Sequence, residues 1–470
     1  MFYPKIIQGG MGVAISGWEL VRAVSLYSKP GKEVLGTGSG TAADRILANL
    51  LKQGGKKADE ICRVLRNSNI AVIREMGERI IEKYFKKISQ GIPVFTVTPS
   101  RSLIELTICA NYAFVTLAKE GHSNPVSMNY LEKIAMPHLF AIYGAMLAEV
   151  DFITMGAGIV LQIPAVFNAY LNGTEAIYKI PVIGSEDYTM RFDPEAFFVK
   201  KIKLNKKPGF LPIVASNTLA KMLAKKLPGE IYGFVVEEDT AGGHNAPPRD
   251  KVTKIYDERD RVNYQELSEL GLPFWIGGSY ASPDGLKRAI ELGAKGIQVG
   301  SIFALSEDSG MDPEIRRKIR KLGFNGELKV ITDMRASPTG FPFKVANIPG
   351  TVSEHIIYEE RQRVCDQSAL VSLYKRPDGS IGYRCASEPV DDYVRKGGKI
   401  EDADGRKCIC NGLLMLAGLQ QVDNVGEPMI VTLGDDTKFL QSLMENQDSV
   451  YGAENALDYL FGGACITYEK

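Results

Sequence analysis

The chain has 470 residues, of which 45% are apolar and 24% charged, as in a large globular domain accompanied by a smaller one. Its 56 Lys and Arg residues balance 56 Asp and Glu residues, so charge gives no reason to expect nucleic acid or an anionic membrane as the partner. The apolar runs are too short to span a bilayer, and the first residues lack a signal-peptide pattern. We expect a cytoplasmic protein that acts on a small molecule, with homo-oligomer formation left open.

Eight short segments rich in Val, Ile and Phe predict buried strands, and several of them run into glycine. In chain order they are Pro4–Gly9, Val34–Gly38, Val126–Tyr130, Asp151–Gly156, Leu211–Ser216, Ile231–Glu237, Pro273–Gly277 and Gly296–Gly300. Continuous apolar strands are buried on both faces, which is typical of a parallel sheet. Helix-like stretches follow several of them; at Ser282–Leu292, Ser282 and Pro283 suit the N-cap and the first helical position. The pattern predicts an α/β fold, a (β/α)8 TIM barrel with insertions and a C-terminal extension, with an open doubly wound sheet as the alternative.

Three stretches depart from a plain barrel. A ninth apolar run, Ile92–Val97, lies in the long segment between the second and third strands, where extra helices are expected. An insertion without a clear period is expected at about 173–209. After Asn347 the character changes, so we place a domain boundary there, between a barrel domain (1–347) and a C-terminal region (348–470). That region holds one more barrel-like strand, Met429–Gly434.

Two glycine loops follow the seventh and eighth predicted strands, where TIM barrels often bind phosphate. The first contains Gly277 and Gly278, and the second contains Gly300 and Ser301. Glycine lets backbone N–H groups approach a phosphate closely, although the same residues also make ordinary tight turns. Two such loops in tandem favour a phosphate site.

The sixth predicted strand leads into Ala241-Gly242-Gly243-His244. The two glycines permit close approach to a flat cofactor, and imidazole titrates near neutrality, so His244 can accept a proton without unusual tuning. A loop histidine that only caps a turn is the alternative. Of the four histidines, His244 alone follows Gly-Gly at a predicted strand end, and we predict that it is the catalytic base.

Taken together and in order, these motifs resemble those of the nitronate monooxygenases, formerly called 2-nitropropane dioxygenases. The resemblance covers about residues 1–345 and rests on Ile6–Gly12, Asn129–Leu131, Tyr143–Ala148, Asp151–Gly158, Ala241–His244, Gly277–Gly278 and Gly293–Ser301. It implies an oxidoreductase of the monooxygenase type, a TIM-barrel flavoprotein with FMN. It also implies flavin contacts from the Gly10 and Met11 backbone and from Asn129, phosphate contacts from Gly278, Gly300 and Ser301, and His244 as the catalytic histidine.

The chain is longer than the family by the insertion and the C-terminal region, and the same fold and Gly-Gly-His loop also serve flavin-dependent enoyl-thioester reductases. The leading prediction is therefore an enzyme that oxidises nitronates or nitroalkanes with oxygen. The first alternative is an NAD(P)H-dependent enoyl-thioester (enoyl-ACP) reductase. The second is a flavin- or metal-binding accessory module with little turnover of its own.

The C-terminal region contains four clustered thiols, Cys365, Cys385, Cys408 and Cys410. Four thiolates can hold zinc or an iron–sulfur cluster, although the C-x-C spacing is not that of a usual zinc knuckle. Buried thiols also serve as small apolar side chains. A zinc or iron–sulfur site and a role in core packing both remain open for these residues.

Overall fold

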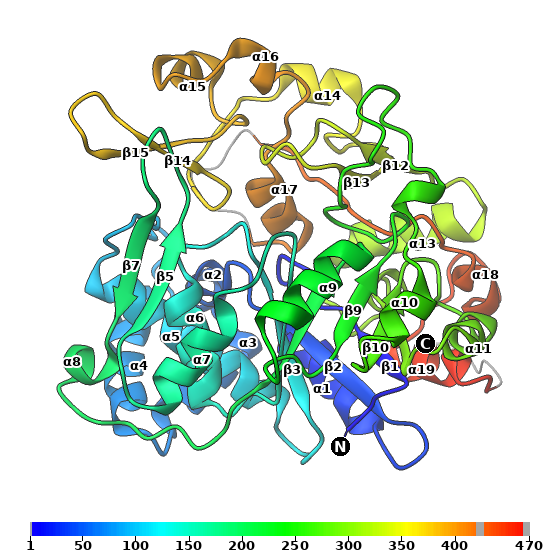
Figure 1. The fold of residues 1–470 in the computed structure, drawn as a ribbon, viewed down its shortest axis with the longest axis horizontal. Helices are drawn as coiled ribbons and strands as arrows, with labels where there is room; N and C mark the ends of the chain where they lie inside the picture. Colours follow the sequence, from blue (N-terminus) through cyan, green and yellow to red (C-terminus); the bar gives the residue numbers. More distant parts are fainter. Residues whose placement is uncertain (1, 420–426, 464–470) are drawn as a thin grey trace.

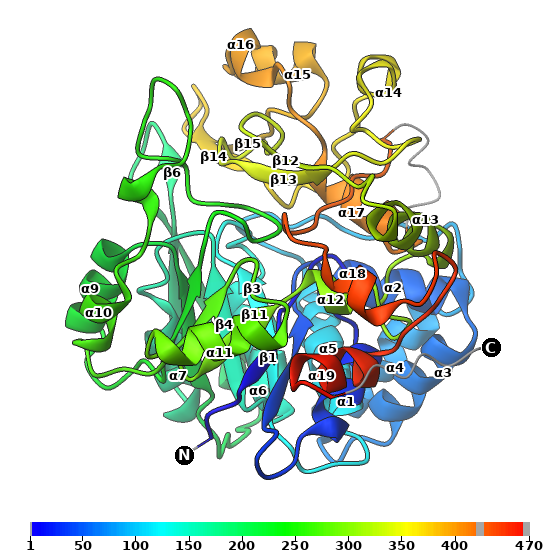
Figure 2. The same cartoon turned by 90° about the vertical axis from the view of Figure 1, so that its right-hand side faces the viewer.

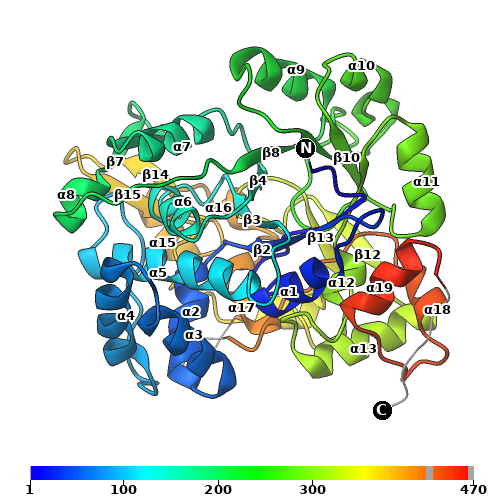
Figure 3. The same ribbon diagram turned by 90° about the horizontal axis from the view of Figure 1, so that it is seen from below.

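The computed structural model describes residues 2–419 and 427–463, and eight parallel strands form a closed barrel at its centre (Figures 1 and 3). The strands are β1 (Ile6–Gln8), β2 (Val34–Ser39), β3 (Val126–Leu131), β4 (Phe152–Gly156), β8 (Gly209–Val214), β9 (Phe234–Glu237), β10 (Phe274–Gly277) and β11 (Gly296–Val299). Around the barrel they follow the order β1-β11-β10-β9-β8-β4-β3-β2. The predicted TIM barrel is confirmed, and all eight strands predicted for it are present.

The barrel closes because its strands are apolar on both faces. Side chains such as Ile7, Leu35 and Trp275 meet inside the barrel in one buried cluster, while their neighbours Ile6 and Val34 pack outward. Burial on both faces is what a parallel sheet inside a ring of helices requires. These interior side chains fill the lower part of the barrel, so ligand space remains only at its upper mouth.

Helices surround the strands (Figure 3). In chain order they are α1 (Trp18–Tyr27), α2 (Ala43–Gln53), α3 (Lys56–Arg66), α4 (Ala71–Tyr84), α5 (Arg101–Ala118), α6 (His138–Leu147), α7 (Ile163–Leu171), α9 (Asn217–Lys226), α10 (Tyr264–Ser268), α11 (Pro283–Glu291), α12 (Ser301–Ala304) and α13 (Pro313–Phe324). A 3-10 turn, η1 (Glu258–Asp260), precedes α10. As predicted, α11 begins at Pro283, and the Ser282 side chain accepts a hydrogen bond from the Gly285 N–H.

The long segment between β2 and β3 carries the expected extra helices, α2 to α5, but no strand forms at Ile92–Val97. The Arg45 guanidinium donates to the carbonyl oxygens of Ile92 and Pro93 at 2.8 and 2.5 Å. Because Pro93 lacks an N–H group and the two carbonyls already have a partner, this run cannot join a ladder.

The insertion after β4 forms an antiparallel hairpin of β5 (Ala176–Ile180) and β7 (Tyr188–Phe192), followed by α8 (Pro194–Phe198). Buried and exposed residues alternate along β5. The expectation that this stretch has no period is therefore wrong. Between the hairpin strands, β6 (Val182–Ile183) pairs with β14 (Ser372–Lys375), which connects the insertion to the C-terminal region.

Most of the chain after α13 lies over the mouth of the barrel (Figure 2). The elements there are β12 (Val330–Asp333), β13 (Phe343–Ala346), α14 (His355–Glu360), β14, β15 (Ile381–Arg384), α15 (Val390–Arg395), α16 (Ile400–Ala403) and α17 (Ile409–Leu416). Residues Met429–Gly434 form no strand; this extended segment runs beside β13, where the Ala346 N–H donates to the Val431 carbonyl at 2.9 Å.

The last two helices, α18 (Phe439–Leu443) and α19 (Ala453–Leu460), return to the flank of the barrel. Helix α19 packs against α1 on one side and against α11 and α12 on the other, so it takes a place in the ring of helices (Figure 3). The boundary near Asn347 stays a prediction. Across residues 2–419 and 427–463, none of the helices combines the length and apolar character needed to cross a bilayer.

His138 makes the stability of the fold depend on pH. Its Nε2 atom lies 3.1 Å from the Leu131 carbonyl oxygen, and burial lowers the pKa of the imidazole from 6.5 to about 4. Between pH 4 and pH 6.5 the imidazole is therefore protonated in the unfolded chain but not in the folded chain. His138 therefore reduces stability as the pH falls from 6.5 towards 4, by up to about 1.4 kcal/mol per pH unit.

We expect urea unfolding at pH 7 and pH 5 to show a smaller acid loss for His138→Gln than for the wild type. The matched control is His355→Gln, because the His355 side chain is 88% exposed. An equal acid loss in the wild type and both variants would contradict the assignment.

Candidate active site at the barrel mouth

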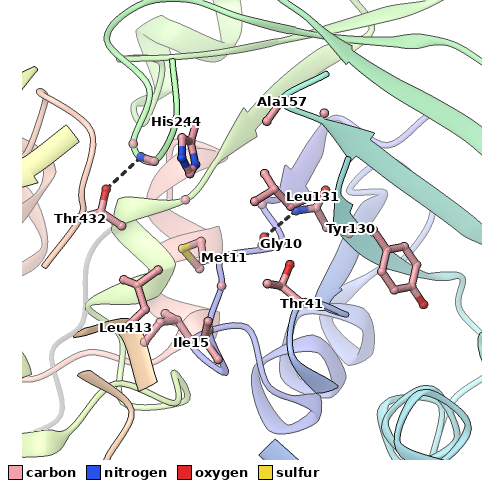
Figure 4. Close-up of a pocket in the computed structure, with 18 of the residues that line it drawn as sticks. Gly10, Met11, Ile15, Thr41, Tyr130, Leu131, Ala157, His244, Leu413 and Thr432 are labelled. Carbon is pink, nitrogen blue, oxygen red and sulfur yellow. Dashed lines mark hydrogen bonds between the residues drawn. The ribbon is translucent and has the colours of Figure 1, made fainter. Parts of the chain in front are cut away.

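A cavity of about 300 Å³ opens at the C-terminal ends of the strands, within the range of small-molecule sites. The predicted site residues Gly10, Met11, Asn129, Gly243, His244, Gly277, Gly278, Gly300 and Ser301 all line it. They come from the ends of five different strands and meet only because the barrel closes. In Figure 4 the His244 ring and the Met11 side chain lie on either side of the same space.

The Gly10-Met11 turn after β1 is fixed by side chains beneath it. Asn129 Nδ2 donates to the Gly10 carbonyl oxygen at 2.9 Å, and the Thr154 hydroxyl donates to Asn129 Oδ1 at the same distance. A Cβ atom at residue 10 would collide with the Asn129 side chain. Glycine is therefore required here, and the turn presents bare backbone to the cavity.

The two loops predicted to bind phosphate lie side by side, after β10 and β11. Gly278 has φ +112° and Ser279 has φ +55°, so the first loop turns sharply away from its strand. No backbone carbonyl among the described residues accepts the N–H groups of Gly278, Ser279 or Gly300. The Thr240 hydroxyl beside them is buried without a partner. Unpaired donors of this kind are what an anionic group would satisfy.

A segment of the C-terminal region that sequence reasoning did not assign to the site, Thr432–Asp436, completes this wall. Ser301 Oγ accepts a hydrogen bond from the Gly434 N–H at 2.8 Å, and Thr432 Oγ1 accepts one from the Gly243 N–H at 2.9 Å (Figure 4). The Asp435 N–H donates to the Thr240 carbonyl at 3.0 Å. The sequence did contain a signal for this segment. The apolar run Met429–Gly434 ends in glycine, as do the strands that precede the two phosphate loops.

His244 is held at the edge of the cavity by two contacts. Its Nε2 atom lies 2.7 Å from Ser337 Oγ, and its ring meets that of Phe343 edge-on at 4.9 Å. Burial and, to a smaller extent, the positive charge of Lys133 lower the pKa of the imidazole to about 3. The Lys133 ammonium lies 3.5 Å from the centre of the Phe341 ring and donates to the Ala157 carbonyl. At neutral pH the imidazole is therefore uncharged.

A carboxyl group that was not predicted, that of Glu237, also lines the cavity, at the end of β9. Burial raises the pKa of Glu237 to about 8. The site thus contains an uncharged imidazole and a carboxyl group that stays protonated at neutral pH, and for the carboxyl group this is the reverse of its usual state.

Beyond Met11 the cavity continues into an apolar chamber between the barrel helices and α17. Its walls include Ile15, Phe95, Met136, Leu370, Leu413 and Leu416. Figure 4 shows Ile15 and Leu413 on the side of the cavity away from His244. The chamber favours a ligand with an apolar part.

The four cysteines, for which the sequence left a metal site and a role in core packing open, do not form a metal site. Cys408 is the N-cap residue of α17, and Cys410 lies in the first turn of that helix and lines the cavity. Burial raises the pKa of the Cys410 thiol to about 12. Among the described residues, which include Cys365 and Cys385 as well, no group of three or more His, Cys, Asp or Glu side chains could hold a metal. A zinc or iron–sulfur site is therefore not found in the described part of the chain; Cys385 and Cys408 are buried in the C-terminal region, whereas Cys365 and Cys410 are partly exposed.

No protein-family model and no curated protein sequence matches the chain. Solved structures similar to it include FabK from Thermotoga maritima, at a TM-score of 0.46 and 13% identity, covering 98% of this chain and 92% of that one. Nitroalkane oxidase from Streptomyces ansochromogenes has a TM-score of 0.46 and 12% identity, covering 98% and 95%. The enoyl reductase domain of MlnA from Bacillus amyloliquefaciens has a TM-score of 0.39 and 12% identity, covering 76% and 67%. At such TM-scores and identities the likeness says nothing about which substrate this chain takes.

Proposed function

We propose that this protein is an FMN-dependent oxidoreductase that oxidises nitronates with oxygen, with His244 as its active-site base. One observation carries the proposal. The unpaired N–H groups of the two phosphate loops, the bare Gly10-Met11 turn and an uncharged imidazole all face one cavity at the barrel mouth. Phosphate binding at this position and catalytic groups at strand ends are general features of TIM-barrel enzymes.

The residues present fit FMN. The N–H groups of Gly278 and Gly300, with the Ser301 hydroxyl, would hold the phosphate, because they are donors without another anionic partner. A flat ring system suits the glycine surface at Gly10 and Gly243, where no side chain projects. When bound, FMN supplies the electron acceptor that the side chains lack.

The chain itself supplies orientation and a proton acceptor. Ser337 engages the Nε2 atom of His244, so Nδ1 is the ring nitrogen left for the substrate. An imidazole with a pKa of about 3 gives little driving force for removing a proton from a neutral nitroalkane. A nitronate has already lost that proton. The low pKa of His244 therefore favours nitronates over nitroalkanes as substrates.

One observation favours a second candidate, reduction of enoyl thioesters with NAD(P)H. The apolar chamber lined by Met136 and Leu413 would accept an acyl chain, which a short nitronate does not have. In this reaction the substrate gains a proton and loses none, so a weakly basic imidazole is no disadvantage.

We expect the purified protein to be yellow and to carry FMN without a covalent bond. Under anaerobic conditions a nitronate should bleach the flavin and oxygen should restore it, whereas NADH and NADPH should leave it oxidised. Absorbance in a stopped-flow instrument measures both reactions. Rapid bleaching by NADPH with turnover of an enoyl thioester would instead support the reductase. Protein that contains no flavin and binds no added FMN would contradict both candidates.

A further inference from the structure

The side chain of Glu237 points into the barrel. Val235, two residues earlier on β9, belongs to the buried cluster inside the barrel, and strand side chains alternate between faces. Glu237 therefore lies on the same inner face, one layer nearer the mouth, where it lines the cavity. The adjacent Glu238 points the opposite way, and its Oε1 atom accepts hydrogen bonds from the Tyr264 and Tyr280 hydroxyls at 2.5 and 3.1 Å.

The neighbouring strands leave an opening beside Glu237. In the barrel register Glu237 is paired with Gly277 on β10, and Gly277 is paired with Gln298 on β11. Side chains in register share one face, so a carboxyl group and a carboxamide flank a position that has no side chain. Both groups line the cavity. A ligand that rests on Gly277 meets a polar group on each side.

Nothing in the described chain balances a charge on Glu237. Burial is the single cause of its shifted pKa, with no contribution from a nearby cation or hydrogen-bond donor. The side chain is partly accessible from the cavity, but ionising a carboxyl group that the barrel encloses and that has no partner is costly, so such a group keeps its proton. A carboxylic acid that keeps its proton at neutral pH is a hydrogen-bond donor.

We propose that Glu237 is a second catalytic residue, a neutral carboxylic acid that donates a hydrogen bond to an acceptor atom of the ligand lying over Gly277. The proposal rests on the proposed function, because that ligand is the cofactor or its substrate. The two residues then have complementary roles at neutral pH: His244 is a proton acceptor, and Glu237 is a hydrogen-bond donor. Ionisation of Glu237 removes the donor and places a negative charge beneath the ligand, so activity falls above the pKa of about 8.

The test follows the FMN-loaded protein from pH 6 to pH 9.5. In the wild type we expect kcat/KM to fall about tenfold per pH unit above the ionisation of Glu237. Glu237→Gln keeps an uncharged donor that cannot ionise, so its profile should be flat; it should stay within about tenfold of the wild type at pH 7 and exceed it at pH 9.5. Glu238→Gln, the adjacent change on the opposite face, should keep the wild-type break.

The absorbance spectrum of the bound flavin, measured without substrate, shows whether the atom that accepts the Glu237 hydrogen bond belongs to the cofactor or to the substrate. A spectral change near pH 8 that Glu237→Gln removes assigns it to the cofactor. A break in kcat/KM without that change assigns it to the substrate. A wild-type profile that is flat through pH 8, or a break that survives in Glu237→Gln, overturns the proposal.

Infrared difference spectroscopy separates this proposal from the proposed function, because it needs neither flavin nor turnover. At pH 7 the wild type should show the carbonyl band of a protonated carboxylic acid that Glu237→Gln lacks and that disappears by pH 9.5. Absence of this band overturns the role of Glu237 even in a fully active flavoenzyme. Its presence in a protein that takes up no flavin would support the protonated acid while the proposed function fails.

Discussion

His244→Asn should lower turnover of any substrate that must lose a proton; a general base contributes about 10²- to 10⁴-fold, and the low pKa of His244 places the expected loss towards the lower end of that range. Asparagine keeps a polar group near the position of Nδ1 but accepts no proton at neutral pH. FMN and the fold should be retained, because asparagine can keep a polar side chain at this position and the packing partner Phe343 is unchanged. Steady-state kinetics on a neutral nitroalkane and on its preformed nitronate, measured in parallel, give the result.

The nitronate has already lost its proton, so the substitution should lower its turnover less than that of the nitroalkane. Two variants make the comparison specific. Ser337→Ala removes the partner of Nε2 but leaves the ring, and it should have a smaller effect. His355→Asn makes the same substitution at an exposed histidine and should have none. Near-wild-type turnover of both substrates by His244→Asn would remove His244 from the mechanism, and loss of FMN would make its role structural.

Gly300→Asp should abolish FMN binding. A Cβ at residue 300 would lie 3.3 Å from Met11 Sδ, the tip of a flexible side chain, so the backbone tolerates a substitution there. The added carboxylate would then lie close to the phosphate. Two unit charges about 4 Å apart repel by about 4 kcal/mol at an effective dielectric constant of 20, or about 10³-fold in affinity. Titration of the apoprotein with FMN, followed by flavin fluorescence, measures this loss.

Gly300→Asn is the matched control, since it adds nearly the same volume without the charge. It should bind FMN far more tightly than Gly300→Asp, and the difference between the two should shrink at high salt. Equal affinities for the two variants would show that residue 300 is not next to the phosphate.

The barrel was predictable because its signal is local. Each strand is a continuous apolar run, several run into glycine, and parallel strands buried on both faces need exactly such runs. The insertion was not predictable in the same way: Ile177 on β5 is apolar yet 42% exposed, which hides the alternation of that strand. At Ile92–Val97 the apolar composition is that of a strand, but the carbonyls bind Arg45.

The parts of the site that consecutive residues form could be predicted from the sequence. The parts that depend on contacts between distant residues could not. His244 and the phosphate loops each carry their own glycines. Glu237 gave no signal, because a strand that is apolar on both faces does not reveal which side chains point inward. Thr432 and Gly434 reach the site through a tertiary contact that no local pattern reports. The cysteines illustrate the opposite error, since their spacing alone cannot distinguish metal ligands from buried thiols.

The hydrogen bond between Gly434 and Ser301 spans 133 positions of sequence. During synthesis the eight barrel strands leave the ribosome well before residue 434, so an emerging chain has its barrel while one wall of the mouth is still missing. Contacts of such large sequence separation also form late in folding, because loop closure must come first. If the barrel mouth binds a phosphate-bearing ligand as proposed, we expect the finished chain to hold it more tightly than a chain that ends before Gly434.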